Sequence, residues 1–423
     1  MELKLKEVLM QKSWTYKFES YKSFFEYVKI INTVFNPQIS VIIISWRLHP
    51  NTIITLKKLF QQKENYNIEV IFVDNGSKIN EFSDFYSFVD NYIRLNQNTG
   101  VSISRNIGAA FSSSPVILFL EDDGIPDEEL IASHLCSHLK FNAHSVRGVC
   151  LPLTNNLLNE KQTHYFRGEH FFPFYANLEG NTSYNAKVFF EVGGWDDDIK
   201  YGGEGKALSI KIWEYSPDIS KQIYSPISII YHDYASNHER LKEKLIQQKR
   251  SFDYLSRKYS VWNKYDELWL ELEGNVSTLK ETDLWKSDSN LQKEYDDLKE
   301  RVKRRNEANL LSYMNGKAFL HETQKIKEII NKFQEKRRIS IFGAGEYGGR
   351  VYENLLRQGI DVKYFIDNDL SKCGDIKSGI PIIKPSSLTK EHFILIASSW
   401  FFEISEQLEK MGYRKNEDFL IVI

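Results

Sequence analysis

Three consecutive carboxylates, Glu121, Asp122 and Asp123, follow directly on the apolar run 115–120 and precede Gly124. A short run of β-branched and aromatic residues is typical of a buried strand in a parallel sheet. Open α/β sheets bind ligands at the carboxyl ends of their strands, and acidic oxygens there suit a hard divalent cation that bridges phosphates. A solvated acidic turn is the alternative interpretation of the same residues.

A second carboxylate, Asp74, ends another apolar run and leads into a turn sequence, Asn75-Gly76-Ser77. Strands and helices are predicted to alternate around these two runs, which indicates right-handed βαβ units and a mostly parallel sheet. The predicted elements are strands at Ile39–Trp46, Ile68–Asp74, Tyr92–Leu95 and Ile227–Tyr231, and helices at Pro50–Gln62, Glu81–Val89, Gly100–Phe111, Glu128–Phe141, Ala207–Glu214 and His238–Tyr259. Asp74 and the acidic cluster would then share one edge of the sheet, which favours a ligand site over a solvated turn.

Composition bounds the class of protein. A chain of 423 residues should hold two or more domains. A net charge of −2 gives no support to a nucleic-acid binder, and the three cysteines have no spacing typical of a zinc site or a disulfide framework. No signal peptide or membrane-spanning run is evident. We therefore expect a cytoplasmic protein, with the inner face of the membrane as an alternative location.

The chain is expected to contain four segments. Residues 1–37 are predicted to be a helical extension, because Phe18, Tyr21, Phe25 and Val28 fall on one stripe. Residues 38–260 form the main α/β domain. Residues 261–336 are charged and predicted to be a helical linker or a contact in a homo-oligomer. The stripe of the first segment and the basic helix 240–258 could each meet a membrane surface, with packing on the protein itself as the alternative.

The last segment, 337–423, is predicted to be a small Rossmann-like α/β domain. A strand at Arg338–Phe342 runs into the glycine-rich turn 343–348, and a second strand ends at Asp367, where a dinucleotide fold places its ribose-binding acid. The segment has under about 100 residues and lacks the second half of a full dinucleotide fold. We expect it to bind a nucleotide through the start of its helix, or to serve pairing alone, and not to perform NAD chemistry.

Five motifs of the main domain occur in a fixed order. They are the strand 40–46, Val73–Ser77, Asn96–Gly108, Leu120–Asp123 and Gly193–Glu204. This order resembles the family 2 glycosyltransferases of the GT-A fold over about residues 38–260. The resemblance implies a nucleotide-diphosphate sugar as donor, most simply a UDP-sugar, and a glycan, lipid-linked or peptide acceptor.

The resemblance also implies roles for residues on the donor side. Ser45 and Arg47 would lie near the nucleotide, Asp74 would accept hydrogen bonds from the base or ribose, and Arg105 would lie at the nucleotide-binding edge. Asn181 falls where the family often contacts the donor.

The metal site implied by the resemblance falls on the acidic cluster. Asp123 would coordinate Mn²⁺ or Mg²⁺, and His232 would complete the site unless its role is structural. Glu121 replaces the first Asp of the family's DxD motif, so one extra methylene must be accommodated, and it would face the ribose or lie in the second shell of the metal. Asp122 belongs to the same donor-binding edge, with its side chain expected to point away from the metal.

The acceptor side departs from the family pattern. Gly205 stands where relatives carry the Asp that takes the proton of the acceptor hydroxyl. Glu204 is the candidate base in its place, with Asp197 and Asp198 as alternatives. The chain is therefore expected to be a metal-dependent, inverting glycosyltransferase. A non-catalytic sugar-binding protein and an oxidoreductase or epimerase centred on the C-terminal domain are the alternatives.

Overall fold

The computed structural model describes residues 15–78, 81–154, 165–199, 202–233, 238–262, 264–265, 267–268, 289–320, 322–334, 337–398 and 400–422. These residues divide into two compact units. The first unit takes in the described residues up to 154, from 169 to 265 and from 289 to 305. The second takes in residues 165–168 and 267–268 and the described residues from 306 onward. The predicted linker 261–336 thus contributes to both units, and part of it lies outside the described residues.

The first unit is built on one mixed sheet, in which ten strands are described. In sheet order they are β1 (Phe25–Ile30), β4 (Asn91–Leu95), β3 (Ile68–Asp74), β2 (Ile39–Ser45), β5 (Val116–Glu121), β9 (Asn181–Asn185), β7 (Ser145–Leu151), β10 (Gln222–Tyr231) and β6 (Ile125–Pro126), with β8 (Phe172–Pro173) beside β10. Strands β4, β3, β2 and β5 are mutually parallel, as expected from the alternation of strands and helices. β9 runs antiparallel to both of its neighbours.

The strand register brings the predicted site residues to one edge. Ser45 is paired with Asp74 on β3, and Ile44 is paired with Glu121 on β5. After Asp123 the chain returns at once as β6, which pairs with the end of β10 through Ile125 and Tyr231. The acidic cluster therefore lies beside the residue that follows β10.

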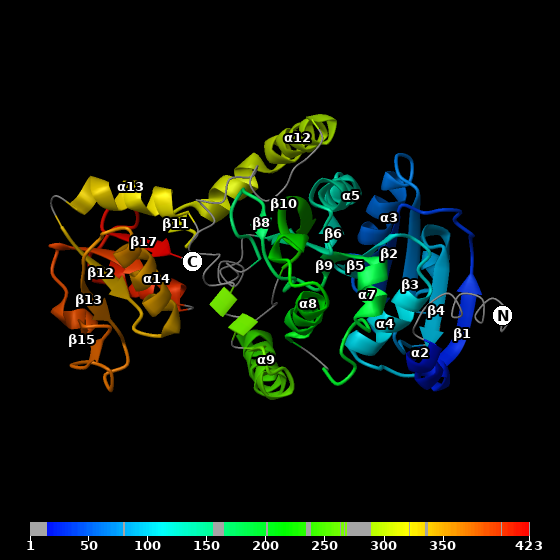
Figure 1. Ribbon diagram of the computed structural model, residues 1–423, viewed down its shortest axis with the longest axis horizontal. Coiled ribbons are helices and arrows are strands. Elements are labelled where there is room, and N and C mark those ends of the chain that lie inside the picture. The colour runs from blue at the N-terminus through cyan, green and yellow to red at the C-terminus, as the bar shows by residue number, and fades with distance from the viewer. Residues whose placement is uncertain are drawn as a thin grey trace. The chain divides into compact units, whose positions relative to one another are not determined.

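Helices cover both faces of this sheet, and Figure 1 shows α3 and α5 on one side with α4, α7 and α8 on the other. One core joins strands β2 to β5 to α4, α7, α8 and the N-terminal α2, and includes Ile42, Ile107, Phe119, Phe189 and Leu208. The helices and short 3₁₀ turns of this unit are α2 (Thr15–Tyr21), η1 (Lys22–Phe24), α3 (Thr52–Gln62), η2 (Ser83–Phe88), α4 (Val101–Ala110), α5 (Leu130–Phe141), α7 (Ala186–Glu191), α8 (Glu204–Tyr215), η3 (Ile219–Lys221), α9 (His238–Lys258) and most of α12 (Ser289–Met314).

The prediction of a helix over residues 1–37 is wrong beyond Tyr21, where α2 ends, and its residues 1–14 lie outside the described part of the chain. Residues 25–30 form β1, which pairs antiparallel with β4 at the edge of the sheet. A strand there uses backbone hydrogen-bonding groups of β4 that a helix would leave unpaired. Phe25 and Val28 still pack against the core, so the apolar stripe lies on the protein itself in this structure. The predicted helix at 81–89 is likewise shorter than expected, because only the 3₁₀ turn η2 forms there.

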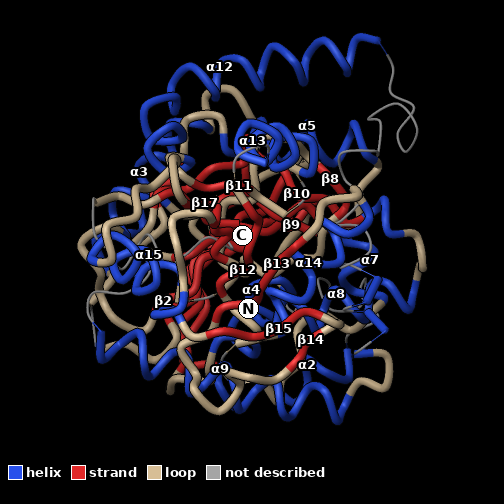
Figure 2. The backbone as a smooth tube through the Cα atoms, turned by 90° about the vertical axis from the view of Figure 1, so that its left-hand side faces the viewer, coloured by secondary structure: helices blue, strands red, loops and turns tan. Residues whose placement is uncertain are grey.

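The second unit holds a smaller sheet in the order β11 (Lys317–Ala318), β17 (Phe419–Val422), β16 (His392–Ile396), β12 (Arg338–Phe342), β13 (Val362–Ile366), β15 (Ile380–Ile383) and β14 (Ile376–Lys377). In this order each strand from β11 through to β15 is parallel to the next, and the last strand, β14, is antiparallel to β15. Helices α13 (Thr323–Gln334) and α14 (Glu346–Arg357) pack on one face, and α15 (Phe401–Lys410) packs on the other. Figure 2 shows α14 and α15 on opposite sides of these strands. The turn η5 (Pro385–Ser387) precedes β16.

Within the described part of the chain, we find no helix that is both long and apolar enough to span a bilayer.

Candidate functional site

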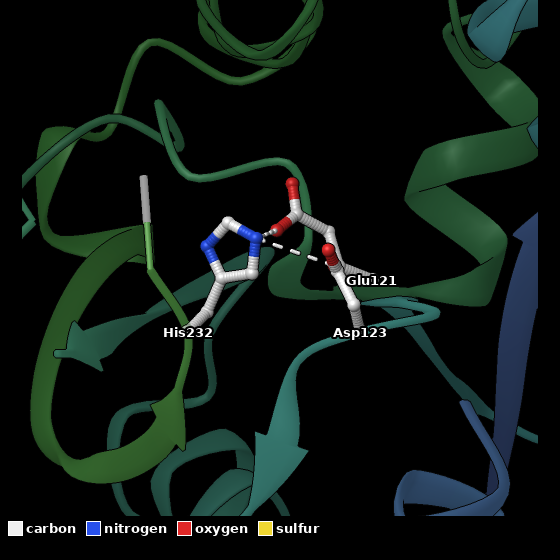
Figure 3. Close-up of side chains that lie close together, drawn as sticks. All are labelled: Glu121, Asp123 and His232. Carbon is white, nitrogen blue, oxygen red and sulfur yellow. Dashed lines mark ion pairs between the residues drawn. The ribbon is translucent and has the colours of Figure 1, made fainter. Parts of the chain in front are cut away.

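Glu121, Asp123 and His232 converge where β5 and β10 end, and Figure 3 shows their side chains facing one another. The Nε2 atom of His232 lies 3.3 Å from a carboxylate oxygen of Asp123 and 3.6 Å from one of Glu121. The three potential ligand atoms all lie within 4.8 Å of one another. Two carboxylate oxygens and an imidazole nitrogen at this spacing fit one divalent cation.

The ionisation of the cluster is coupled. Burial acts to lower the pKa of His232, but Glu121 and the hydrogen bond with Asp123 outweigh it and hold that pKa well above its usual value. Burial acts to raise the pKa of Asp123, yet His232 and His49 keep it below its usual value. Positive charge at the centre of these ligands is therefore favoured by the surrounding groups.

The extra methylene of Glu121 is accommodated by Gly180. A Cβ atom at position 180 would lie 2.0 Å from Cγ and 2.4 Å from Cδ of Glu121. The backbone is joined at the same point, because the N–H of Glu121 donates to the carbonyl of Gly180 over 3.0 Å. The absence of a side chain at 180 thus makes room for Glu where the family's motif has Asp. The sequence did not mark Gly180 as a site residue, since it lies in an irregular segment before a polar strand.

Asp122 is directed toward β2 and not toward the cluster. Its carboxylate accepts a hydrogen bond from Ser45 Oγ, which also donates to the carbonyl of Arg47 over 3.0 Å. Burial, and next the charge of Asp123, raise the pKa of Asp122 to about 7. The hydrogen bond between Ser45 and Asp122 therefore joins the end of β2 to the acidic turn. The Arg47 side chain is exposed and lies over the ring of Trp46.

His49 was not among the predicted site residues. Its Nε2 atom lies 3.9 Å from the second carboxylate oxygen of Asp123, opposite the contact with His232. Nothing in its sequence context distinguished it, because it follows an exposed segment with no regular pattern.

Asp74 is fully buried, and its carboxylate is held by its own chain. One oxygen accepts from the N–H of Ser77 over 2.9 Å, and the other accepts from the hydroxyl of Tyr92 over 2.6 Å and from the guanidinium of Arg94. The contact with a base or ribose expected at Asp74 stays a prediction. Within the protein, the Asp74 carboxylate holds the turn at the end of β3 through the N–H of Ser77.

Arg105 and Glu204 interact electrostatically. Arg105 is 8 % exposed, with its guanidinium 5.1 Å from the ring centre of Trp195. Glu204, the first residue of α8, is 4 % exposed. Its pKa rises to about 7, first because of burial and next because of Glu179, while Arg105 opposes the rise. Glu179 is a half-buried carboxylate that the sequence did not single out.

Gly205 has no space for a side chain. A Cβ atom there would lie 2.0 Å from the carbonyl oxygen of Ala176 and 2.8 Å from Oε1 of Glu179. The same Glu179 oxygen accepts the N–H of Gly205 over 2.9 Å. The position where the family carries Asp therefore has no room for a side chain in this structure.

The other candidate bases are engaged in structural contacts. Asp197 accepts hydrogen bonds from the hydroxyl of Tyr21 and the amide of Asn106, and pairs with Lys17 at 3.4 Å. Asp198 pairs with Lys258 of α9 at 3.0 Å. These contacts attach α2, α4 and α9 to the loop before α8.

Asn181, the weakest donor-side expectation, is also structural. It is fully buried, and its amide joins His134 to the carbonyls of Val149 and Ser228. The amide is thus engaged within the protein, and the donor contact expected at this residue stays a prediction.

The backbone of the glycine-rich turn 343–348 in the second unit is hydrogen-bonded by the side chains of Asp367 and Lys377. Asp367 accepts the N–H of Ala344 over 3.0 Å, as an acid after β13 should. Lys377 donates to the carbonyls of Ala344 and Gly345 over 3.0 and 2.7 Å. The turn joins β12 to α14, and both a Rossmann-like assignment and ligand binding by the turn stay predictions.

Comparison with known proteins follows the division into two units. Residues 40–195 match the family model for glycosyl transferase family 2, so the expectation of such a domain is confirmed over that range. Residues 335–418 match a family model described as C2185-like, N-terminal.

Individual relatives are distant. A glucosyl-dolichyl phosphate glucuronosyltransferase of Haloferax volcanii is 22% identical over 229 residues, which are 51% of this chain and 70% of that protein. An uncharacterized glycosyltransferase of Haemophilus influenzae is 38% identical over 86 residues, which are 20% of this chain and 29% of that protein. A mannosyltransferase of Pyrobaculum calidifontis, solved with GDP-Man and Mn²⁺, aligns with a TM-score of 0.38 and 12% identity over 59% of this chain and 76% of that one. That score is too low to support further comparison.

Proposed function

We propose that the first unit is the catalytic part of a metal-dependent glycosyltransferase. It would move a sugar from a nucleotide-diphosphate sugar, most simply a UDP-sugar, to an acceptor hydroxyl with inversion. The observation that carries this proposal is the convergence of Glu121, Asp123 and His232 within 4.8 Å. Glu121 and Asp123 lie at the end of a strand inside the family 2 match, and His232 comes from beyond it. Strand ends of parallel sheets are where such ligands bind.

The cluster would hold Mn²⁺ or Mg²⁺ through Asp123, Glu121 and His232. The imidazole nitrogen favours Mn²⁺, because Mg²⁺ is held chiefly through oxygen and water. When bound, such a cation acts as a Lewis acid on the leaving diphosphate. The chain's own contribution is to fix these ligands: Gly180 leaves space for Glu121, and Ser45 holds the turn through Asp122.

Ser45, Arg47 and Arg105 are proposed to lie along the nucleotide-sugar, and Asp74 to order the same edge from beneath. Glu204, beside Arg105, belongs to a carboxylate pair that serves the acceptor hydroxyl. The Haloferax relative is named for transfer to glucosyl-dolichyl phosphate, which supports a lipid-linked glycan among the acceptors to be tried. A cytoplasmic location, contact with the membrane face and homo-oligomer formation stay predictions.

The proposal is tested by turnover of UDP-sugars. UDP-glucose, UDP-galactose, UDP-N-acetylglucosamine and UDP-glucuronic acid would be supplied with Mn²⁺ and octyl glycosides, and UDP release measured with and without EDTA. We expect metal-dependent release from at least one donor, and its loss in Asp123→Ala. Release that persists unchanged in Asp123→Ala would overturn the proposal.

A further inference from the structure

Gly205 removes a carboxylate from the acceptor side, and a different carboxylate fills the same space. The Oε1 atom of Glu179 lies 2.8 Å from the point where a Cβ atom of residue 205 would be. It is fixed there by the N–H of Gly205, which donates to it over 2.9 Å. This N–H belongs to the first turn of α8, where backbone donors have no partner inside the helix and favour a negative charge.

We propose that Glu179 is the residue that accepts the proton of the acceptor hydroxyl, in place of the side chain that Gly205 lacks. This assignment rests on the proposed function. It differs from the sequence expectation, which placed the base at Glu204.

The position of Glu179 next to the metal ligands supports the assignment. The following residue, Gly180, contacts the side chain of Glu121 and accepts its N–H over 3.0 Å. The dipeptide 179–180 therefore spans from the candidate metal ligands to the start of α8. A carboxylate on this dipeptide lies beside the place where the leaving diphosphate and the acceptor must meet.

Exposure separates the two members of the carboxylate pair. Glu204 is 4 % exposed, whereas Glu179 is half-buried and keeps a surface that a hydroxyl can approach. Burial favours the protonated form of Glu204. Its pKa of about 7, set by burial and then by Glu179, agrees with that division. Glu204 is then a positioning residue, and Glu179 the group that touches the acceptor.

In the proposed transfer, the acceptor O–H bond breaks, and its proton passes to the Glu179 carboxylate as the oxygen forms a bond to the anomeric carbon. The bond from that carbon to the diphosphate oxygen breaks, and its electron pair leaves with the nucleoside diphosphate. A positioned base of this kind contributes about 10²–10⁴-fold to the rate.

The test compares Glu179→Gln, Glu179→Asp and Glu204→Gln, with Glu191→Gln at an exposed position as the matched control. Binding of UDP with Mn²⁺ would be measured by calorimetry, and transfer from the four UDP-sugars to octyl glycosides by UDP release. We expect Glu179→Gln to lower kcat by about 10²-fold or more with little change in UDP affinity or donor KM. Glu179→Asp should recover part of the loss, and Glu204→Gln should have the smaller effect.

Several results would overturn the assignment. A Glu179→Gln enzyme with unchanged kcat, or one that loses UDP affinity and kcat together, would remove Glu179 from the proton transfer. Loss of transfer in Glu204→Gln with activity retained in Glu179→Gln would return the role to Glu204. If the wild-type protein neither binds UDP with Mn²⁺ nor turns over any donor, the proposed function fails and this assignment fails with it.

Discussion

A methyl group at position 180 is expected to weaken metal binding without unfolding the protein. The Cβ atom of Gly180→Ala would lie 2.0 Å from Cγ of Glu121, whereas ordinary contact begins at 3.4 Å. The Glu121 side chain is 34% exposed and can rotate away from the new methyl group. Gly180 is not among the glycines with positive φ, so alanine can adopt its backbone conformation and the clash is the cause of any effect.

The size of the effect follows from the required displacement. Glu121 must move by about 1.4 Å, whereas ligand distances in metal sites vary by only about 0.2 Å. We therefore expect the loss of one ligand and a fall of about 10–100-fold in Mn²⁺ affinity, equivalent to about 1.4–2.7 kcal/mol. Titration of Mn²⁺ followed by electron paramagnetic resonance measures the free ion directly. Gly345→Ala, where φ is −76° and nothing lies within 4 Å of the added Cβ atom, is the control.

A double-mutant cycle shows whether the effect passes through Glu121. In the Glu121→Ala background the added methyl group has no side chain to displace, so Gly180→Ala should cause no further loss of Mn²⁺ affinity. An equal loss in both backgrounds, or no loss in the otherwise wild-type protein, would refute the reasoning.

Three further predictions concern the acceptor side and the supports of the first unit. Gly205→Asp should not restore a base, because its Cβ atom would lie 2.0 Å from the carbonyl oxygen of Ala176. Thermal unfolding should therefore occur at lower temperature, and the rate of sugar transfer should not rise. A gain in transfer would show that position 205 can hold a side chain. Arg305→Ala should lower the free energy of unfolding by about 2 kcal/mol in denaturant titrations. The reason is that it removes the guanidinium paired at 3.1 Å with the buried carboxylate of Asp127. Burial lowers the pKa of His134 to about 4, so the folded protein holds this residue in its neutral form. As the pH falls from 6.5 toward 4, protonation of the unfolded chain at this residue should lower the free energy of unfolding by about 1.4 kcal/mol per pH unit. His134→Gln should remove this contribution to the pH dependence of the free energy of unfolding.

The sequence was informative where chemistry coincided with regular periodicity. The strand before Glu121 is a continuous apolar run, and its end carries the acids, so both the strand and the ligand site could be predicted from it. His232 was expected through the family resemblance, and it follows the apolar end of β10. The parallel register then brought Ser45, Asp74 and Glu121 to one edge, as the alternation of strands and helices predicted.

The sequence was uninformative where polar residues are buried in pairs. Strand β9 reads Asn-Thr-Ser-Tyr-Asn, which has no apolar face, yet its side chains are buried because His134 and His138 of α5 satisfy Ser183. Such partners are distant in the chain and leave no local signal. Glu179 and Gly180 precede this strand, and their importance depends on contacts with residues 205 and 121 that only the folded chain reveals.

For Asp74, the sequence predicted the position of the residue but not its hydrogen-bond partners. Its position was predicted correctly, but a carboxylate at a strand end is equally suited to a ligand and to the chain's own donors. The turn at Ser77 and the side chains of Tyr92 and Arg94 take both oxygens. The position of a group on the sheet could thus be read from the sequence, whereas its hydrogen-bond partners could not.

The central claim is that Glu121, Asp123 and His232 form a divalent-cation site for a nucleoside diphosphate. It is tested most directly by titrating Mn²⁺ into the wild-type protein and Asp123→Asn, each with and without UDP, and following the free ion by electron paramagnetic resonance. The account predicts one site in the wild type, tighter binding in the presence of UDP, and loss of that site in Asp123→Asn. Equal Mn²⁺ binding by both proteins, unaffected by UDP, would contradict it.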